Sequence, residues 1–488
     1  MDPFNWHDIF SNFSVVMNTI YAVTVVVILL LIITENRSPI KSISWILVVA
    51  LIPVFGVVFY LFFGQKYRKN IIISLRVARF QKRVKTLSEK QLRQLKNIKP
   101  GEVDPVLAEK RDLMSLLLRN DNAFLSRNTN VQILKNGTET FQSVKKAIQQ
   151  AKHHIHLEFY IIQFDQIGTE IFDLLKEKAS QGVEVRVIYD SVGSYPLSRK
   201  KRFAMRKAGI QLKSFQKVVV PLLSSKVNYR NHRKIIVIDG KIGFTGGLNI
   251  ADRYIENKEK YWRDTFVRIE GKSVSALQSI FMNDWFYVSK QNIYHEKYFC
   301  ETEAENGNLT QIISSGPDSD WHAISQFYFS VITSSKKSVF IATPYFIPND
   351  EISFALKAAA LRGIDVRILI PKKADSMISH WSGQSYFGEM LKAGVKIYRY
   401  TKGFIHSKLV MSDEIVCSIG TANLDYRSLE TNFEVCAVFY DKNICQQLTK
   451  QYINDIENAE LIVYPKWKNR PRYKKLIVSF ARLFAPLM

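Results

Sequence analysis

One segment of this 488-residue sequence occurs twice, and the repeat constrains the fold more than any other feature. Residues 231–250 read NHRKIIVIDGKIGFTGGLNI, and residues 405–424 read IHSKLVMSDEIVCSIGTANL. Histidine, lysine, aspartate, glycine and asparagine recur at a constant offset, with His232 and His406 174 residues apart. A long internal repeat of this kind indicates one folding module that is used twice.

The repeat extends upstream, where its pattern is that of strands alternating with helices. The run HHIHLEFYII, which begins at His153, corresponds to KSVFIATPYFI, which begins at Lys337. Further on, GVEVRVIYD from Gly182 corresponds to GIDVRILIP from Gly363. A helical pattern lies between the two runs in each half, over 171–180 and 352–361. This alternation predicts an α/β sandwich in each half.

Two uncharged runs of 22 residues, 13–34 and 43–64, precede the repeat. As a helix, each is roughly 33 Å long, which is enough to cross a hydrocarbon core of roughly 30 Å. A cleaved signal peptide is not expected, because the first twelve residues contain no Lys or Arg and a second run follows at once. We therefore predict a transmembrane helical hairpin. Pro53 and Gly56 leave open a kink or a shallow re-entrant hairpin in the second run.

Basic residues around the hairpin predict its orientation. Residues 66–99 contain twelve Lys or Arg and one acid, Glu89, and the loop between the runs holds Arg37 and Lys41. The positive-inside bias places this side in the cytoplasm, and two spans then return the N-terminus to the same side. Residues 69–99 have a helical pattern. This helix is expected either to lie on anionic lipid or to be a solvated linker.

The net charge of +24 favours an anionic partner, either a nucleic acid or an anionic membrane surface. The two apolar runs favour the membrane. The four cysteines contain no CxxC pair, which argues against a disulfide framework and is typical of a reducing compartment.

The composition divides the chain into four parts. The polar run 300–308 lacks periodicity and is the predicted linker between the halves. The C-terminal run KKLIVSFARLFAPLM is basic and then apolar, which predicts either a second helix on the membrane surface or a helix packed on the domain. The predicted parts are a two-span hairpin, a basic juxtamembrane linker and two tandem halves, with the bounds 1–66, 67–110, 111–305 and 306–488.

The repeated motif contains the residues that chemistry at phosphorus needs. A strand has a period of two, so His232 and Lys234 share one face, as do His406 and Lys408. A histidine beside a lysine is poor hydrophobic core. The lysine can hold phosphate oxygens, and the histidine can attack phosphorus or move a proton. Two copies at matching spacing favour this interpretation over a structural role for the histidines.

The other repeated residues are expected to support the motif. Asp239 and Asp413 lie at an odd spacing from their histidines, so we interpret them as hydrogen-bonding supports. The repeated glycines let backbones approach closely, and Asn249 and Asn423 supply donors near a phosphate.

HRKIIVID and HSKLVMSD resemble the two HKD motifs of the phospholipase D superfamily, and the resemblance covers the chain from about Val131 onward. The segments GGLNIADRY, YWRDTFVRIEG, ATPYFIP, GTANLDYRSLETNFEV and ARLFAPLM are similar to those of bacterial cardiolipin synthases, as is the start with WILVVALIPVFGVVFYLFFGQKYRK. The resemblance implies an α/β fold with two tandem phospholipase D-like α/β sandwich domains around a pseudo-twofold active site, preceded by the N-terminal transmembrane helical hairpin.

The resemblance also implies a mechanism with two histidines and without a metal or another cofactor. One histidine attacks phosphorus and forms a phosphohistidine, and the other protonates the leaving alcohol and then deprotonates the incoming one. Similarity to the superfamily favours His232 as the nucleophile, although the sequence itself does not assign the two roles. The expected reaction transfers a phosphatidyl group between two phosphatidylglycerol molecules and gives cardiolipin and glycerol. The alternatives are a phospholipase D hydrolase or a synthase that uses another alcohol, a nucleic-acid-binding protein or nuclease, and an inactive scaffold, against which both motifs are intact.

Matching positions imply the remaining site residues. The catalytic set is His232, Lys234, Asp239, His406, Lys408 and Asp413, and the phosphate-binding set is Asn249, Asn423, Gly247 and Thr421. Glu434 is the expected carboxylate partner of His406. The same offset in the first half falls on Lys260, so Asp264 is the nearest candidate partner for His232.

Two features leave alternatives open. Arg427 and Ser428 are expected either to line the site or to form a cap and salt bridge at a helix start. The cluster at 153–156 holds three histidines, but only His154 and His156 share a face and no matching acid set is present, so no metal is expected. The expected partners are phosphatidylglycerol and anionic membrane lipids, and no nucleic acid. The expected location is the bacterial cytoplasmic membrane, multi-pass, with the active site on the cytoplasmic side.

Overall fold

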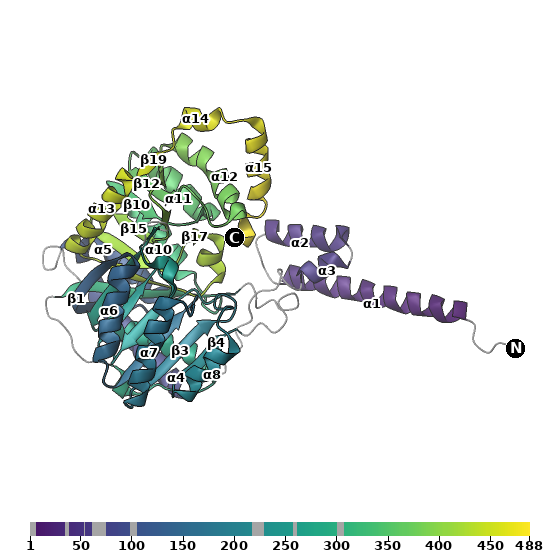
Figure 1. Ribbon diagram of the computed structural model, residues 1–488. Helices are drawn as coiled ribbons and strands as arrows, with labels where there is room; N and C mark the ends of the chain where they lie inside the picture. Colours follow the sequence, from purple (N-terminus) through teal and green to yellow (C-terminus); the bar gives the residue numbers. More distant parts are fainter. Residues whose placement is uncertain are drawn as a thin grey trace. The chain divides into compact units, whose positions relative to one another are not determined.

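The computed structural model describes residues 6–34, 39–52, 54–60, 75–97, 105–216, 229–256, 261–299 and 307–488. These residues form an N-terminal unit of helices and a large α/β unit (Figure 1).

The N-terminal unit contains α1 (Trp6–Thr34), α2 (Pro39–Leu51) and α3 (Phe55–Phe59). The stretch Val15–Thr34 of α1 is apolar and long enough to cross a membrane. Threonine hydroxyls in α1 are satisfied inside the helix, and that of Thr24 donates to the carbonyl oxygen of Ile20 at 2.8 Å. The first predicted span is therefore one continuous apolar helix.

The second predicted span, 43–64, is not one continuous helix among the described residues, which corrects that expectation. α2 ends at Leu51, two residues before Pro53 in the sequence, since a proline disfavours helix in the residue before it, and Val54 has a φ of 64° that a β-branched residue rarely adopts. Gly56 lets α3 approach α2 closely, since a Cβ there would lie 2.3 Å from the carbonyl oxygen of Val48. The interruption that the proline and glycine left open is therefore present, as two short helices in place of one. The end of this run lies outside the described residues.

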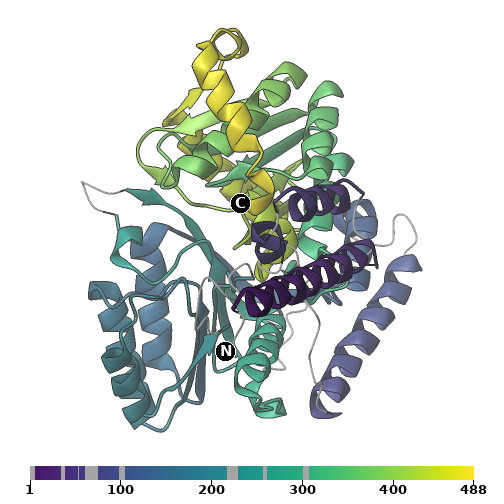
Figure 2. The ribbon, with the colours of Figure 1, turned by 90° about the vertical axis from the view of Figure 1, so that its right-hand side faces the viewer.

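The large unit is built on one 15-stranded sheet, in which the repeat appears as two sets of strands in the same order (Figures 1 and 2). In the first half the order is β1 (Ser126–Lys135), β8 (Thr265–Gly271), β6 (Ile242–Gly246), β5 (Ile235–Ile238), β2 (His154–Phe159), β3 (Glu184–Asp190) and β4 (Gln211–Phe215). In the second half the order is β9 (Asn308–Ser315), β18 (Glu434–Phe439), β16 (Val416–Gly420), β15 (Leu409–Ser412), β10 (Ser338–Ala342), β12 (Asp365–Pro371), β13 (Lys396–Tyr400) and an additional strand, β19 (Ala459–Leu461).

The two halves join edge to edge through corresponding strands. β1 pairs antiparallel with β9, from Ser126 opposite Thr310 to Asn128 opposite Asn308. Because the paired strands are equivalent, this pairing relates the halves by a pseudo-twofold axis. Two small sheets add further contacts, with β7 (Trp262–Arg263) parallel to β14 (Phe404–Ile405) and β11 (Phe346–Ile347) parallel to β17 (Leu424–Asp425).

Helices cover both faces of the sheet, as the predicted α/β sandwiches require. One face packs against α6 (Asn136–Gln150) and α7 (Gln166–Ser180) in the first half and against α10 (Ala323–Ser334), α11 (Asp350–Leu361) and α12 (Met377–Ala393) in the second. The other face packs against α9 (Val274–Ser289) and α13 (Lys442–Glu457). The core on that face combines Ile235 and Val267 of the first half with Leu409 and Ile419 of the second, so the halves form one unit.

The helix expected to lie on lipid or to be a solvated linker is α4 (Leu75–Lys96). Its described side chains instead pack on the sheet unit, because Val84 and Leu87 contact the shared core and Leu95 is buried in the core of the second half. The amide of Gln91 donates to the carbonyl oxygen of Leu125 at 2.7 Å. This part of α4, together with α5 (Pro105–Asn120), belongs to the large unit, so the alternative of a solvated linker is wrong, and contact of the helix with lipid stays a prediction. Most of the predicted linker at 300–308 lies outside the described residues, and the domain bounds stay predictions.

Candidate active site

The backbone of each histidine is held by the other half of the protein. The N–H of His232 donates to the carbonyl oxygen of Phe433 at 2.9 Å, and the N–H of His406 donates to the carbonyl oxygen of Arg263 at 2.7 Å. Phe433 and Arg263 each directly precede a buried carboxylate in the sequence. The two histidine segments are thereby fixed beside the carboxylates of the opposite half.

Each histidine side chain also contacts a carboxylate of the other half. Nδ1 of His232 lies 3.0 Å from both carboxylate oxygens of Glu434, and Nδ1 of His406 lies 2.7 Å from Oδ2 of Asp264. The expected pairs, Glu434 with His406 and Asp264 with His232, are therefore wrong. Each carboxylate contacts the histidine of the other half.

The strand register explains why the constant offset of 174 residues gave the wrong histidine–carboxylate pairs. The repeated glycines, Gly246 in β6 and Gly420 in β16, each pair with the residue two positions after the carboxylate. The two carboxylates are therefore equivalent in the fold. The first half has four more residues than the second between its repeated asparagine and its carboxylate, so the constant offset falls on Lys260. The exchange of carboxylates arises only when the two halves dock. The strand pattern within one half contains no information about this docking.

The two lysines complete the site, as predicted. Nζ of the buried Lys234 donates to the carbonyl oxygen of His232 at 2.7 Å, and Nζ of Lys408 lies 2.9 Å and 3.1 Å from the ring nitrogens of His406. Burial lowers the pKa of Lys234 to about 7 and that of Lys408 to about 8. Burial lowers the pKa of His406 well below its usual value, and the charges of Lys408, Lys234 and His232 lower it further.

The two histidine–carboxylate pairs differ in charge. Burial alone would raise the pKa of Glu434, but its neighbours, chiefly His232, outweigh burial and hold this pKa below its ordinary value. For Asp264 burial dominates and raises the pKa to about 7. Burial also lowers the pKa of His232 to about 4. Near neutral pH, Glu434 is thus ionised beside a neutral His232, whereas Asp264 beside His406 is partly protonated.

One repeated position contributes to this difference. The hydroxyl of Thr421 donates to Oε2 of Glu434. The equivalent residue is Gly247, where an added Cβ would lie 2.2 Å from Oδ1 of Asp264. Thr421 therefore supplies a donor to an ionised carboxylate, and Gly247 makes room for the other carboxylate. These contacts do not support the phosphate-binding role that was expected for the two residues.

Asp239 and Asp413 act at the far ends of the same strands. The carboxylate of Asp239 accepts the N–H groups of residues 152–154 at 2.8–2.9 Å, and that of Asp413 accepts those of residues 336–338 at 2.8–3.0 Å. Both aspartates follow β5 and β15, which the histidines precede, and they have φ values of 54° and 55°. Their interpretation as hydrogen-bonding supports is confirmed, and their grouping with the catalytic residues is wrong.

The repeated asparagines contact protein groups. The amide of Asn249 accepts the N–H of Ile161 at 3.0 Å and donates to the hydroxyl of Tyr254 at 2.7 Å. Nδ2 of Asn423 donates to Asp425 at 3.1 Å, and its buried Oδ1 has no hydrogen-bond partner among the described residues. A role for the asparagines in phosphate binding stays a prediction.

A single turn of π-helix, Arg427–Thr431, follows the second motif. The N–H of Ser428 donates to Oδ1 of Asp425 at 2.7 Å, which is a cap of the kind that one alternative predicted. The N–H of Arg427 donates to the carbonyl oxygen of Met488 at 2.8 Å, so the C-terminal segment contacts this turn. Turns of this type often occur at functional sites.

Sequence reasoning missed the aromatic rings that pack on the histidines. The ring of Tyr160 lies edge-on to His232 with centroids 5.1 Å apart, and the rings of Tyr254 and Trp262 lie 5.6 Å and 5.4 Å from that of His406. These rings shield the imidazoles from water. Tyr254 and Trp262 lie in GGLNIADRY and YWRDTFVRIEG, which the resemblance covers, but nothing in these segments indicated a contact with a histidine.

The residues between each histidine and lysine point away from the site, as expected. The guanidinium of Arg233 pairs with Asp284 at 2.5 Å and donates to the carbonyl oxygen of Glu434 at 3.2 Å. The corresponding residue, Ser407, has its hydroxyl 3.2 Å from that of Thr265. The first motif therefore has a buried ion pair beneath it where the second has two hydroxyls.

The histidine cluster upstream is held by neutral and cationic protein groups. The rings of His154 and His156 lie 3.2 Å and 3.1 Å from Oε1 of Gln278, and Nε2 of His156 lies 3.1 Å from the guanidinium of Arg186. A metal ion beside that guanidinium would be repelled. Burial lowers the pKa of His154 to about 4, so the cluster is best explained as packed, uncharged core.

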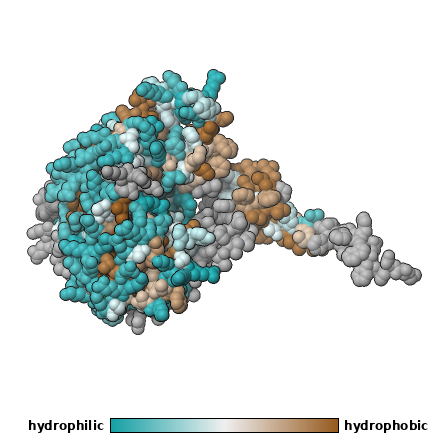
Figure 3. Space-filling model, viewed as in Figure 1, coloured by the Kyte–Doolittle hydropathy of each residue, from teal (hydrophilic) through white to brown (hydrophobic). Residues whose placement is uncertain are grey.

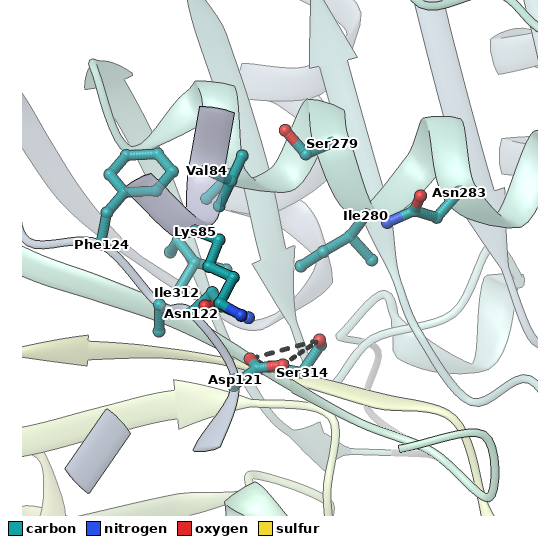
Figure 4. A pocket seen from close by; sticks show the side chains of 12 residues that line it. Val84, Lys85, Asp121, Asn122, Phe124, Ser279, Ile280, Asn283, Ile312 and Ser314 are labelled. Carbon is teal, nitrogen blue, oxygen red and sulfur yellow. Dashed lines mark hydrogen bonds between the residues drawn. The ribbon is translucent and has the colours of Figure 1, made fainter. Parts of the chain in front are cut away.

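A cavity of about 470 Å³ lies between α4, α9 and β9, and none of the histidine-site residues lines it (Figure 4). At its polar end the carboxylate of Asp121 accepts the hydroxyl of Ser314 at 3.1 Å. Burial raises the pKa of Asp121 to about 7. The cavity is therefore distinct from the candidate active site.

Two known families match the chain. Residues 144–285 and 328–456 match the family described as cardiolipin synthase, PLD-like domain, and these ranges contain both histidine motifs. Residues 20–65 match the family described as phospholipase D-nuclease N-terminal.

Relatives match over nearly the whole chain. The cardiolipin synthase of Alkalihalophilus pseudofirmus is 42% identical over 479 residues, which cover 97% of this chain and 94% of the relative. The cardiolipin synthase of Geobacillus kaustophilus is 42% identical over 484 residues, which cover 98% of this chain and 94% of the relative.

Two solved structures share the fold of the large unit. The phosphatidylserine synthase of Haemophilus influenzae has a TM-score of 0.59 at 15% identity, with 79% of this chain and 100% of that chain covered. The polyphosphate kinase of Porphyromonas gingivalis has a TM-score of 0.50 at 11% identity, with 74% and 54% covered. At such identities the likeness concerns the fold alone.

Proposed function

The chain belongs to the family of cardiolipin synthases with phospholipase D-like domains, and from this membership we propose how its two histidines divide the work of phosphatidyl transfer. Members of this family are phosphatidyltransferases of the phospholipase D type, which act on phospholipids at a membrane. The proposed substrates are two phosphatidylglycerol molecules, of which one donates its phosphatidyl group and the other accepts it. The observation that carries the proposal is the exchanged pairing of carboxylates. His232 contacts Glu434, whose pKa is lowered, and His406 contacts Asp264, whose pKa is raised, so the two histidines differ in protonation.

We assign the nucleophile to His232. The ionised Glu434 accepts the Nδ1 proton of His232, which leaves the lone pair on Nε2 free. Nε2 attacks phosphorus, the bond from phosphorus to the glycerol oxygen breaks, and a phosphatidyl-histidine forms. The hydroxyl of Thr421 supports this step by keeping Glu434 ionised and in place.

We assign the acid and base to His406. Its partner Asp264 is partly protonated near neutral pH, so Nε2 of His406 can give a proton to the leaving glycerol while the Asp264 proton moves to Nδ1. In the second step Nε2 takes the proton of the incoming hydroxyl. That oxygen attacks phosphorus, the bond from phosphorus to His232 breaks, and cardiolipin is formed.

The two lysines stabilise negative charge on the phosphoryl oxygens. Lys234 and Lys408 are buried, and without a substrate their ammonium groups are partly desolvated and repel each other. An anionic phosphodiester would restore their full charge. Such preorganised donors act more strongly on the developing charge than water does.

The rings of Tyr160, Tyr254 and Trp262 support transfer over hydrolysis. The rings cover one side of each imidazole and so limit the directions from which water can approach. A lipid hydroxyl is held at the site by its acyl chains and is less affected by this cover. We further propose that the chain is multi-pass in the bacterial cytoplasmic membrane, with the site on the cytoplasmic side, because residues 66–99 are strongly basic.

One experiment tests the proposed reaction. Purified full-length protein is incubated with vesicles of phosphatidylglycerol alone, and lipids and water-soluble products are analysed. Equal amounts of cardiolipin and glycerol are expected. Phosphatidic acid and glycerol without cardiolipin would contradict the transfer and indicate hydrolysis.

A further inference from the structure

The candidate site lies at one end of the sheet, and the strand directions define which helices begin there. β2 and β10 run antiparallel to β5 and β15, which follow the histidines, and β3 and β12 run parallel to β2 and β10. The carboxyl ends of β3 and β12 therefore lie at the end of the sheet that holds the histidines. The helices that follow them, α8 (Arg199–Lys207) and α12, begin at this end.

Large apolar side chains are exposed at this end in both halves. In the first half, Tyr195 precedes α8 and is 86% exposed, and Phe203 of α8 is 70% exposed. In the second half, Met377 and Ile378 open α12 and are also exposed. Such side chains, rimmed by polar residues, usually mark a binding surface.

The C-terminal helix α15 (Arg472–Arg482) extends this surface in the second half. Its Val478 and Ala481 are buried, and the hydroxyl of Ser382 in α12 donates to the carbonyl oxygen of Ala481 at 2.7 Å. The other face of the segment exposes Leu476 (73%), Phe480 (62%) and Leu483 (72%). One face of α15 thus packs on the domain, as one alternative predicted, and the other face is largely exposed; a place for that face on the membrane surface stays a prediction.

The charge of α8 and of the C-terminal segment has one sign, although Arg482 of α15 pairs with Glu389 of α12 at 3.1 Å and Asp375 precedes the start of α12. All six basic residues of α8 lie within nine positions without an acid, and residues 464–488 contain seven Lys or Arg and no Asp or Glu. Figure 3 shows hydrophobic residues beside hydrophilic ones along the part of the molecule where α15 lies in Figure 1. A helix with an apolar face flanked by basic residues is typical of segments that lie in the interface of an anionic bilayer.

We propose that α8 and α15, with Tyr195 and the start of α12, form a bilayer-docking surface that holds the end of the sheet with the histidines against anionic lipid. The exposed aromatic and leucine side chains enter the boundary between headgroups and acyl chains, and the basic side chains bind headgroup phosphates. The C-terminal segment also contacts the turn that follows the second motif, because the Arg427 N–H donates to the carbonyl oxygen of Met488, six residues after α15. The proposal rests on the proposed function only for the choice of phosphatidylglycerol as the lipid.

The first test measures depth in the bilayer. Full-length protein with Cys300→Ser carries an environment-sensitive fluorophore on Leu476→Cys and is placed in phosphatidylglycerol nanodiscs that contain a lipid-bound quencher. The matched control is Leu361→Cys, because Leu361 is 74% exposed and ends α11, near the opposite end of the sheet. The label at 476 is expected to be quenched more strongly than the label at 361, by roughly twofold or more. Equal quenching overturns the proposal.

The second test separates docking from chemistry. The double variant Leu476→Glu/Phe480→Glu changes exposed side chains and is compared with Leu361→Glu. The double variant is expected to lose activity on phosphatidylglycerol bilayers by roughly tenfold or more, and to keep activity on monomeric short-chain phosphatidylglycerol. Leu361→Glu should affect neither. Equal loss on both substrates would assign α15 a structural role and contradict docking. If the unaltered protein makes no cardiolipin at all, the proposed function fails while the quenching result still stands.

Discussion

Replacing Glu434 by glutamine tests the exchanged pairs and the roles of the two histidines together. The substitution keeps the size of the side chain and removes the charge that accepts the Nδ1 proton of His232 over 3.0 Å. A hydrogen bond to a charged group contributes about 1.5–3 kcal/mol, which corresponds to roughly 10- to 150-fold in rate. The new amide can also donate to Nδ1 and favour the wrong tautomer, for which the related change in serine proteases costs roughly 10⁴-fold. We expect formation of the covalent intermediate to slow by roughly 10²- to 10⁴-fold.

The matched control is Asp264→Asn. The amide N–H of the asparagine can replace the O–H of a protonated Asp264 toward Nδ1 of His406, but it cannot pass a proton on. With a substrate that has a good leaving group, the first step needs no acid, so the burst of leaving group should stay within about tenfold of the unaltered protein. Turnover to cardiolipin should nevertheless stop.

The assay follows the release of p-nitrophenol from phosphatidyl-p-nitrophenol in single-turnover experiments, with radiolabelled phosphatidyl trapped on the protein. Asp264→Asn and His406→Ala should retain the label, and Glu434→Gln and His232→Ala should not. A full burst in Glu434→Gln together with no burst in Asp264→Asn would assign the nucleophile to His406. A full burst in both would refute the view that these carboxylates set the protonation of the histidines.

Further predictions concern the lysines, the supports, the pH profile and the topology. Lys234→Ala should lower turnover by roughly 100-fold with little change in the melting temperature, because the lysine acts on substrate charge. Asp239→Asn should lower the free energy of unfolding by about 1–3 kcal/mol, measured in urea, with unchanged activity per folded molecule, because its carboxylate binds three backbone N–H groups. The kcat/KM should rise through a pH of about 4 as His232 loses its proton and fall above about 7 as Asp264 loses its proton and Lys234 its charge; a flat profile from pH 5 to 9 would contradict this. Cysteine labels before α1 and after Lys69 should both be protected in intact cells, and outside labelling of the first alone would instead indicate a single span.

The sequence predicted the two halves and the four central residues of the site because repetition is a direct signal. The strand period placed Lys234 with His232 and Lys408 with His406, and the resemblance to the superfamily brought the two pairs to one site. The constant offset of the repeat failed for the carboxylates because the first half has four more residues before Asp264, and an insertion is invisible to a fixed offset. A fixed offset also contains no information on how the two halves dock, and docking brings each carboxylate to the histidine of the other half through β1 with β9, β7 with β14 and the shared core.

The second membrane run shows a different limit. A hydropathy average over a window of residues is the same for one straight helix and for two short ones. The run 43–64 was therefore predicted to be one span. The local backbone decides between them, and here Pro53 and the positive φ of Val54 end the first helix. The N-terminal expectation therefore held for α1, where no proline or glycine interrupts the run.

A duplicated module would give two equal histidines if the copies had stayed alike, and equal histidines cannot serve as nucleophile and acid at the same time. The departures from the repeat lie where they separate the two pairs. Thr421 gives the ionised Glu434 a hydroxyl donor, and the equivalent Gly247 gives Asp264 only space. Because each carboxylate acts on the histidine of the other half, a change in one copy alters the nucleophile or the acid of its partner. A Thr421→Val variant should therefore raise the pKa of Glu434 and weaken His232, and slow the burst of leaving group by roughly tenfold while leaving the step that depends on His406 unchanged. An unchanged burst in this variant would show that the hydroxyl has no part in separating the two roles.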